Sequence, residues 1–532
     1  MTTQKTASQS AWSLGKGLAG ALGLICLAYP LFFYGLGQRD LYSSHEGRAA
    51  QDAQSILNEG VWALPHLFDL HPELQKPPLY YWLVAILSRL RGTAVDETAV
   101  RLPAALSALG TVLAVYAWCV FRGRARAGLL AALVLATAMH YTWLARVGRI
   151  DMPLTLTTTV ALLAFHESWS QSGTAGGVWR IVAYLAIATS IMLKGPIGLI
   201  LALVVLAPMI LLYRSRGLSP CSLGLRSGLA IIALAVGPWF AWAMWKSQGA
   251  LFQTFLIYHN VERALGGGEL RAHPFWFYVP RLALDFLPWT PVLLVCMPMA
   301  VLWSRPDSDE RFSLIWLGSM FLLLSLVRFK RADYLLPAYP GAAILVGCML
   351  DRLCGRIECS RLAWTGVAGT IACIASASWV YYVERVLPKA EPFLEDRRFA
   401  SEVRKLAPQP ALILFFRAEN HALAFHLGPP LDTFLEWENL DIWVGRPGPY
   451  YIVMPVDCLE ESPRHLTAGR LEAVLRNTDV PNAANHERPL VLVRTHPNHE
   501  PFAARRDRPR KAQDRFESGK LAGARTDDSD DR

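Results

Sequence analysis

Cysteine is scarce where a disulfide framework could form. Eight of the nine cysteines, from Cys26 to Cys373, lie in apolar stretches or in the short segments between them, and Cys458 stands alone in the C-terminal region. That region therefore has no intramolecular disulfide available. Cys354 and Cys359 lack the two further nearby ligands that a zinc site needs. The pattern excludes a disulfide-stabilised domain and a structural zinc motif.

The sequence also lacks an internal repeat and a glycine-rich nucleotide loop. The triplet Gly266–Gly268 follows no strand-like run, so it does not resemble a phosphate-binding loop. Charged residues make up only 18% of the chain, and the net charge of +9 comes from basic residues scattered through short loops and from the tail Arg505–Lys520. This scatter favours membrane loops and a solvated tail, and we expect no nucleic-acid partner.

Long apolar runs are abundant. The chain is 53% hydrophobic with a mean hydropathy of +0.26, and apolar stretches recur from Gly17 to Tyr382. Each is near the roughly 20 residues that cross a bilayer, which predicts an all-α membrane protein of about eleven spans. The first stretch, Gly17–Gly37, resembles a signal peptide but has no small-residue cleavage site, so we expect an uncleaved helix. The predicted span centres are Ile25, Ala108, Val134, Leu162, Ala186, Val204, Ala235, Val292, Phe321, Ala343 and Ile371.

An odd number of spans places the two ends of the chain on opposite sides of the membrane. Short basic loops at 122–126, 214–216 and 352–361 follow even-numbered spans, which puts these loops and the N-terminus in the cytoplasm. The opposite face carries basic residues too. We expect a binding role for them, since their loops also hold carboxylates and aromatics.

The hydropathy divides the chain into three parts. Residues 1–387 form the transmembrane part, and its long outward loop 38–99 contains a polar helix at 46–57 and an interfacial helix at 79–90. Residues 388–497 are predicted to form a small exported α/β domain. Its expected strands are 411–416, 450–456 and 490–493, and its expected helix is 466–475. The charged tail 498–532 is expected to be disordered.

Charged residues gather on the predicted outward face. Charges near membrane depth are costly and indicate a functional site, although a single Arg or Lys at a span end can be an interfacial anchor. These residues are His45, Glu46, Arg48, Lys76, Arg149, Asp151, Lys194, His259, Glu262, Arg263, Arg328, Lys330, Arg331 and Asp333, with Tyr334 beside them.

An ordered set of motifs carries a resemblance to a known family. The motifs lie at 42–48, 58–65, 74–78, 100–103, 149–151, 192–195, 262–263, 274–280, 287–289 and 330–340. Together they resemble the bacterial aminoarabinose transferases of lipid A and the wider protein O-mannosyltransferase-like family. The resemblance covers about residues 20 to 390.

The resemblance implies a GT-C membrane bundle with an exoplasmic active site and a sugar donor linked to polyprenyl phosphate. It implies that Asp151 is an active-site carboxylate. The residues it implies for binding the donor phosphate are Lys76, Lys194, Arg263, Lys330 and Tyr334.

Two positions depart from the family pattern. The first-loop motif commonly reads Asp-Glu, and here it is His45-Glu46. The Glu before Lys-Pro, which can bind a metal in the aminoarabinose transferases, is Gln75 here. An amide is a weaker ligand than a carboxylate for a hard cation. We therefore expect no metal, a phosphate charge met by Lys and Arg alone, and transfer that chelators do not affect.

Glycosyl transfer requires a base for the acceptor's proton and cations for the leaving phosphate. Glu46, Asp151 and a neutral His45 are the possible bases. We favour Glu46, with His45 as its partner, over the alternative that Glu46 only forms a salt bridge to Arg48 or another loop cation.

The sequence thus predicts a bacterial inner-membrane glycosyltransferase with its site and C-terminal domain in the periplasm. Its partners would be a polyprenyl-phosphate sugar, a lipid, protein or glycan acceptor, and the bilayer. The alternatives are a lipid-linked-sugar flippase, which the apolar middles of the spans disfavour, and a membrane scaffold with a periplasmic binding domain.

Overall fold

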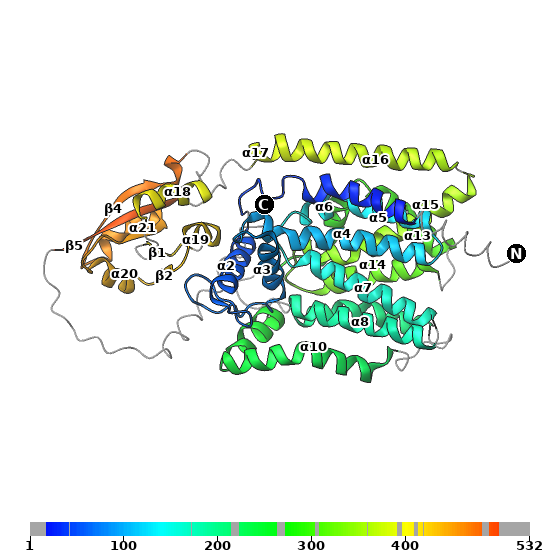
Figure 1. Cartoon of the computed structure of the whole chain (residues 1–532), viewed down its shortest axis with the longest axis horizontal. Coiled ribbons are helices and arrows are strands. Elements are labelled where there is room, and N and C mark those ends of the chain that lie inside the picture. The colour runs from blue at the N-terminus through cyan, green and yellow to red at the C-terminus, as the bar shows by residue number, and fades with distance from the viewer. Residues whose placement is uncertain are drawn as a thin grey trace.

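The fold is taken from a computed structural model. It describes residues 17–41, 43–171, 173–213, 223–262, 272–303, 308–358, 360–390, 396–408, 413–418, 420–480 and 489–498. Two parts lie side by side along the long axis, a large helical bundle and a smaller sheet-containing domain (Figure 1). The predicted tail 498–532 lies outside the described residues except for Asn498.

Each predicted span centre falls within a helix. These helices are Gly17–Phe33, α4 (Glu97–Phe121), α5 (Ala125–Thr137), α7 (Asp151–Ser170), α8 (Gly173–Lys194), α9 (Pro196–Tyr213), α10 (Leu225–Lys246), α13 (Thr290–Trp303), α14 (Asp309–Leu326), α15 (Tyr339–Arg356) and α16 (Arg361–Tyr381). Shorter helices are α6 (Met139–Leu144), α12 (Tyr278–Asp285) and α17 (Leu387–Ala390).

Fewer helices than the eleven predicted spans are long and apolar enough to cross a membrane. Among the described residues, five continuous helical stretches are long and apolar enough to cross a bilayer: Glu97–Phe121, Gly173–Lys194, Leu225–Lys246, Ala332–Arg356 and Leu362–Lys389. The pair Phe275–Asp285 and Thr290–Trp303 passes together but bends by 116°. The structure therefore supports a membrane bundle, and the predicted count of about eleven spans is not confirmed.

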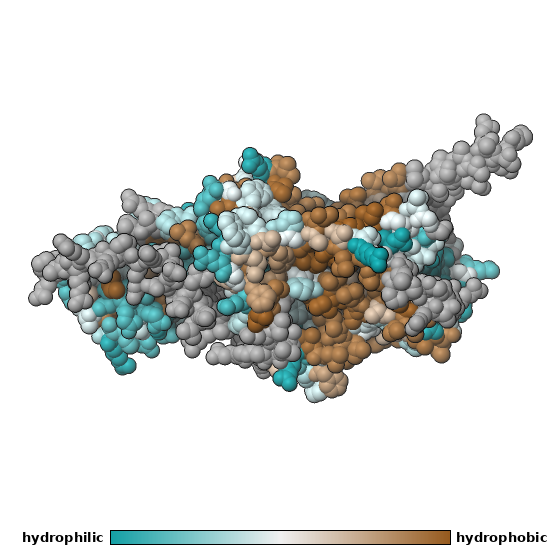
Figure 2. Space-filling model, turned by 90° about the horizontal axis from the view of Figure 1, so that it is seen from below, coloured by the Kyte–Doolittle hydropathy of each residue, from teal (hydrophilic) through white to brown (hydrophobic). Residues whose placement is uncertain are grey.

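The bundle packs around one continuous apolar core. Helix α7 lies along α8, and α5 lies along α15. Large side chains such as Trp316 and Tyr339 are fully buried between helices. Figure 2 shows a broad hydrophobic surface over the bundle, while hydrophilic side chains dominate the visible described surface of the smaller domain. An apolar outer surface is what contact with lipid requires.

Two helices of the predicted loop 38–99 lie at one end of the bundle. The first, α2 (Ser44–Glu59), begins where the Ser43 side chain accepts a hydrogen bond from the Glu46 amide, and it ends at Gly60, whose φ of +72° favours glycine. The second is α3 (Leu79–Arg91). Both predicted helical segments of this loop are therefore helices.

The smaller domain is built on a five-stranded mixed sheet with the order β2-β1-β3-β5-β4. Strand β1 pairs in parallel with β2 and β3, and β5 pairs antiparallel with β3 and β4. Helices α18 and α19 cover one face, and α20 and α21 cover the other. The bounds are α18 (Asp396–Leu406), β1 (Ile413–Phe416), α19 (His421–Leu427), β2 (Asp432–Phe434), α20 (Trp437–Val444), β3 (Tyr451–Pro455), α21 (Val456–Glu461), β4 (Gly469–Arg476) and β5 (Leu490–Pro497).

One predicted element of this domain is wrong. The segment 466–475, expected as a helix, is mostly the edge strand β4, which pairs with β5 from Gly469 to Arg476. Backbone pairing with a buried neighbour outweighs the weak helical spacing of its leucines.

Candidate active site

A cavity of about 200 Å³ lies where the loop 38–99 meets the end of the helical bundle. Its polar lining comes from segments far apart in the sequence: His45, Arg48, Gln75, Lys76, Tyr80, Tyr81, Arg149, Asp151, Lys194, His259, Arg331, Asp333 and Tyr334. Its apolar lining includes Leu154, Ile197, Leu201, Phe255, Leu324 and Val327. The cavity therefore has a charged part and an apolar part.

Asp151 is the first residue of α7, and its carboxylate lies at the helix N-terminus, where a negative charge is favourable. Lys194, the last residue of α8, places its Nζ 2.6 Å from Asp151 Oδ1. Gly195 follows with a φ of +76°, which reverses the chain at this point. The Lys194 ammonium also lies 4.5 Å from the centre of the Tyr334 ring.

A second ion pair faces the first. Arg149 Nη1 lies 2.7 Å from Asp333 Oδ2, and Arg149 Nε lies 3.7 Å from Asp151 Oδ2. Arg331 Nε lies 3.8 Å from the same Asp333 oxygen. Two carboxylates are thus held among several cations, with Asp151 and Asp333 sharing Arg149.

His45 and Lys76 meet on another wall of the cavity. His45 Nδ1 lies 3.3 Å from Lys76 Nζ and accepts its hydrogen bond. Burial, followed by the charges of Lys76 and Arg149, holds the pKa of His45 well below its ordinary value, so the imidazole is neutral. Burial, with the nearby Arg48, Arg149 and Lys194, also lowers the pKa of Lys76 to about 7, although Glu73 opposes that shift.

Glu73 and Gln75 anchor Arg48 at the cavity wall. Glu73 Oε2 accepts from Arg48 Nε at 3.2 Å and from Nη2 at 2.8 Å. With its amide oxygen turned toward Arg48, Gln75 accepts from both terminal guanidinium nitrogens at 3.0 Å. The fully buried Asp52 lies nearby, and burial and the Glu73 charge raise its pKa well above the ordinary range.

These contacts do not suit a divalent cation in the cavity. Gln75 offers a neutral oxygen that faces Arg48, and Glu73 is committed to the same guanidinium. Lys76 adds a further positive charge beside them. A dication would have to displace these cations from their partners.

The structure brings five of the predicted site residues together. His45, Lys76, Asp151, Lys194 and Tyr334 all line the cavity. Arg263 lies outside the described residues. Lys330 is buried beside the cavity, and its Nζ donates to the backbone carbonyls of His273 and Val327. Lys330 therefore fixes a loop and does not point into the cavity lining.

Glu46 does not line the cavity either. Its carboxylate is fully buried, with Arg101 Nε 2.8 Å from Oε1 and Arg101 Nη2 3.0 Å from Oε2. The amide of Gly148 also donates to Oε1 at 2.7 Å. This geometry favours the salt-bridge alternative for Glu46, with Arg101 as the partner in place of Arg48, and does not favour Glu46 as the base.

Sequence reasoning left other lining residues unassigned. Arg48, Arg149, Arg331 and Asp333 all reach the cavity. Each lies within three residues of a predicted site residue, and this proximity was the feature of the sequence that could have indicated a role for it. Glu73 gave no signal, because its role depends on the contact with Arg48 across 25 residues.

Comparisons with known proteins agree with this fold. Residues 75–242 match the family model of dolichyl-phosphate-mannose-protein mannosyltransferases. An undecaprenyl phosphate-alpha-4-amino-4-deoxy-L-arabinose arabinosyl transferase 1 from Sodalis glossinidius is 29% identical over 62% of this chain and 59% of its own length. The protein of the same name from Pseudomonas fluorescens is 28% identical over 69% of this chain and 66% of its own length.

The fold is that of a solved aminoarabinose transferase. The crystal structure of ArnT from Cupriavidus metallidurans bound to undecaprenyl phosphate superposes with a TM-score of 0.74, covering 89% of this chain and 97% of that one at 19% identity. The chain is therefore similar to the ArnT-like GT-C glycosyltransferases in sequence and in fold. The sequence matches span less than two thirds of the two transferases' own lengths, so the similarity supports the general architecture and leaves the substrates open.

Proposed function

We propose that this ArnT-like chain is a membrane glycosyltransferase that moves a sugar from a polyprenyl-phosphate donor to a lipid, protein or glycan acceptor. The observation that carries the proposal is the charge balance of the cavity. Five cations (Arg48, Lys76, Arg149, Lys194 and Arg331) line it against two carboxylates, Asp151 and Asp333. Glu73 offsets one more charge behind Arg48, and the remaining surplus suits a phosphate.

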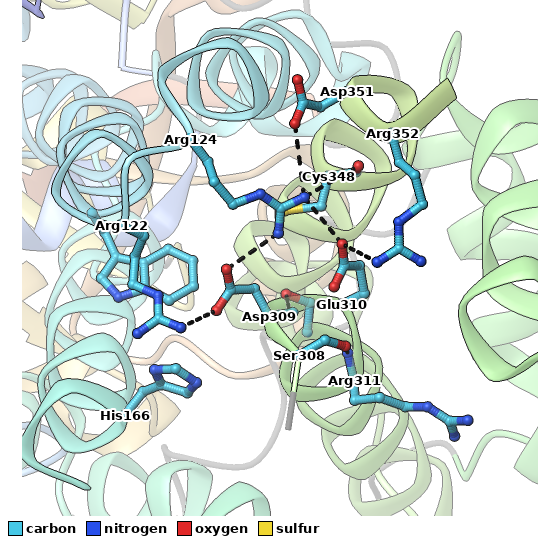
Figure 3. Close-up of polar contacts among 12 residues, drawn as sticks. Arg122, Arg124, His166, Ser308, Asp309, Glu310, Arg311, Cys348, Asp351 and Arg352 are labelled. Atoms are coloured by element: carbon cyan, nitrogen blue, oxygen red, sulfur yellow. Dashed lines mark hydrogen bonds and ion pairs between the residues drawn. The ribbon is translucent and has the colours of Figure 1, made fainter. Parts of the chain in front are cut away.

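A charged cluster at the opposite end of α4 provides the contrast. There Arg122, Arg124 and Arg352 meet the carboxylates of Asp309, Glu310 and Asp351 (Figure 3). Arg126 also pairs with Asp351, and Arg122 lies 3.6 Å from Glu167. These ion pairs join four cations to four carboxylates. Such a balance is expected of a structural network that connects α4 and α5 with α14 and α15. The cavity lacks this balance, which favours an anionic ligand.

The two parts of the cavity fit the two parts of the donor. In this proposal Lys76 and Lys194, which line the cavity, bind the phosphate, and the Tyr334 hydroxyl is an additional donor. The apolar wall formed by Leu201, Phe255 and Leu324 suits the start of an isoprenoid chain. A lipid-linked phosphate therefore fits better than a free nucleotide sugar.

Asp151 is the base in this proposal. When the donor phosphate attracts Lys194, the Asp151 carboxylate loses its closest cation and becomes able to accept a proton. The acceptor oxygen or nitrogen then forms a bond to the anomeric carbon, the bond from that carbon to the phosphate oxygen breaks, and the acceptor's proton moves to Asp151. Polyprenyl phosphate leaves with the bonding electrons. His45, which accepts from Lys76 through Nδ1, orients that lysine and remains neutral.

The topology supports a periplasmic site. Helix α4 runs from the cavity end at Glu97 to the arginine-rich end at Phe121. Short basic loops favour the cytoplasmic side, which would place the cavity and the sheet domain in the periplasm. A reporter that is active only in the cytoplasm, fused after Thr495, should remain silent.

The test is an assay in proteoliposomes with a polyprenyl-phosphate sugar and cell-envelope acceptors. Mass spectrometry should detect both free polyprenyl phosphate and a glycosylated acceptor, and neither should form with Asp151→Asn. A flippase or a scaffold would release no polyprenyl phosphate, so its absence with every acceptor class would overturn the proposal.

A further inference from the structure

The sheet domain docks on the helix that carries part of the cavity. Helix α19 packs against α2, where the Gln51 side chain donates to the His421 carbonyl at 2.8 Å. A Cβ at Gly47 would collide with the backbone of His421 and Ala422, so the two helices are in backbone contact. Because His45 and Arg48 stand on the same helix, the docking joint is structurally linked to the cavity.

Three side chains with metal-binding atoms converge at this joint. His426 of α19 places Nε2 2.7 Å from Asp40 Oδ1 and 3.9 Å from Glu97 Oε1. One ligand atom from each of the three lies within 4.8 Å of the other two. The three side chains are no more than 11% exposed and come from the loop before α2, the start of α4 and the sheet domain. Among the described residues, this is the one such group of three.

Two buried carboxylates lie close together at the joint. Asp40 Oδ1 lies 2.7 Å from His426 Nε2, and Asp40 Oδ2 accepts a hydrogen bond from the Arg397 amide at 2.8 Å. The Arg397 side chain is the cation on Glu97, and the nearby Arg101 pairs with Glu46. Buried carboxylates are stable only with hydrogen bonds, a cation, a proton or a metal ion beside them.

We propose that Asp40, Glu97 and His426 form a zinc site that clamps the sheet domain onto the helical bundle. One imidazole and two carboxylates are a ligand set that Zn²⁺ accepts, with water in the fourth position. Mg²⁺ and Ca²⁺ prefer all-oxygen sites with six or more ligands, so they fit less well. The Arg397 side chain, which lies on Glu97, is 50% exposed and can turn into solvent when the metal enters.

This site is separate from the transfer chemistry. None of the three ligands lines the cavity. The expectation that the cavity itself needs no metal is therefore unchanged. A clamp would hold α2, and with it His45 and Arg48, in one position.

The experiment measures zinc directly on the full-length protein in detergent, carrying an affinity tag without histidine. Chelator-stripped protein is titrated with Zn²⁺ by calorimetry, and bound metal is counted by mass spectrometry. We expect about one Zn²⁺ per chain, with binding weakened at least about tenfold in Glu97→Gln and in His426→Gln, since even loss of a group supporting a ligand costs that much. Zn²⁺ should also raise the melting temperature of the wild-type protein, and not that of Glu97→Gln or His426→Gln.

Two control variants complete the design. His496→Gln removes another His–Glu pair of the sheet domain, Nε2 to Glu472 Oε2 at 2.5 Å, and should bind Zn²⁺ like the wild type. Asp151→Asn, in the cavity, should also bind it normally, so the result does not depend on the proposed transfer activity. If stripped wild-type protein takes up no Zn²⁺, or if Glu97→Gln and His426→Gln bind it as tightly as the wild type, the proposal is overturned and the three side chains are a salt-bridge latch.

Discussion

The Lys194 ammonium lies 2.6 Å from the Asp151 carboxylate, although 43 residues separate the two in the sequence. This pair joins the end of α8 to the start of α7 at the cavity wall. A cation that neutralises a carboxylate in the empty site can turn to a phosphate in the loaded one. The pair therefore links donor binding to the availability of the base.

Replacing Asp151 by Asn should abolish most transfer while leaving donor binding intact. The amide cannot accept the acceptor's proton, and loss of a general base typically slows a reaction about 10²- to 10⁴-fold. Single-turnover kinetics with a fixed donor concentration would measure the loss. A variant that transfers at the wild-type rate would exclude Asp151 as the base.

Lys194→Met should weaken donor binding, and Lys330→Met should not. Lys194 faces the cavity, so its removal should cost about 1.5–3 kcal/mol of donor binding, the value of a hydrogen bond to a charged group. Lys330 is not part of the lining and donates to two backbone carbonyls, so its loss should lower the melting temperature instead. Affinity for a lipid-linked sugar phosphate, measured beside thermal unfolding, separates the two effects. Equal losses of affinity would mean that Lys330 also reaches the phosphate.

Donor affinity should fall as the pH rises through about 7. In the empty cavity the pKa of Lys76 is about 7, so this lysine is charged at pH 6 and mostly neutral at pH 8.5. The phosphodiester of the donor keeps its single negative charge throughout this range. Binding above pH 7 must therefore include uptake of a proton by Lys76, which weakens it by up to about tenfold per pH unit.

The matched control for this pH dependence is Lys76→Arg. An arginine stays charged over the same range, so the profile of donor affinity against pH should flatten. The two profiles can be recorded by equilibrium binding between pH 6 and pH 8.5. An unchanged slope in Lys76→Arg would assign the titration to another group.

Glu46→Gln should destabilise the fold. Its carboxylate is fully buried against Arg101, and removing one partner of a buried ion pair costs about 3–5 kcal/mol. Glu402→Gln is the control, because Glu402 pairs with Lys405 at the surface, where such pairs contribute at most about 1 kcal/mol. Denaturant unfolding in detergent would compare the two. A Glu46→Gln protein of full stability that fails to transfer sugar would restore Glu46 as a candidate base.

The membrane architecture was largely predictable, because it depends on a local property. Runs of apolar residues must be helical to satisfy their backbone in lipid, so every predicted span centre lies in a helix. How many of these helices cross was not predictable, because the bend of 116° between α12 and α13 depends on packing. The edge strand β4 was missed for a related reason, since its conformation is set by the distant partner β5.

The order of residues along the chain specifies which charged groups stand at one set of helix ends, and this was enough to indicate an anionic substrate. Which of these groups face one cavity depends on how the helices pack. Glu46 and Asp151 are equivalent by sequence pattern. In the structure Glu46 is buried in an ion pair with Arg101, 55 residues away, whereas Asp151 lines the cavity. Likewise, nothing local connects Asp40 and Glu97 with His426. The direction of a side chain depends on the rotation of its helix and on long-range packing, and neither is encoded in a motif of a few residues.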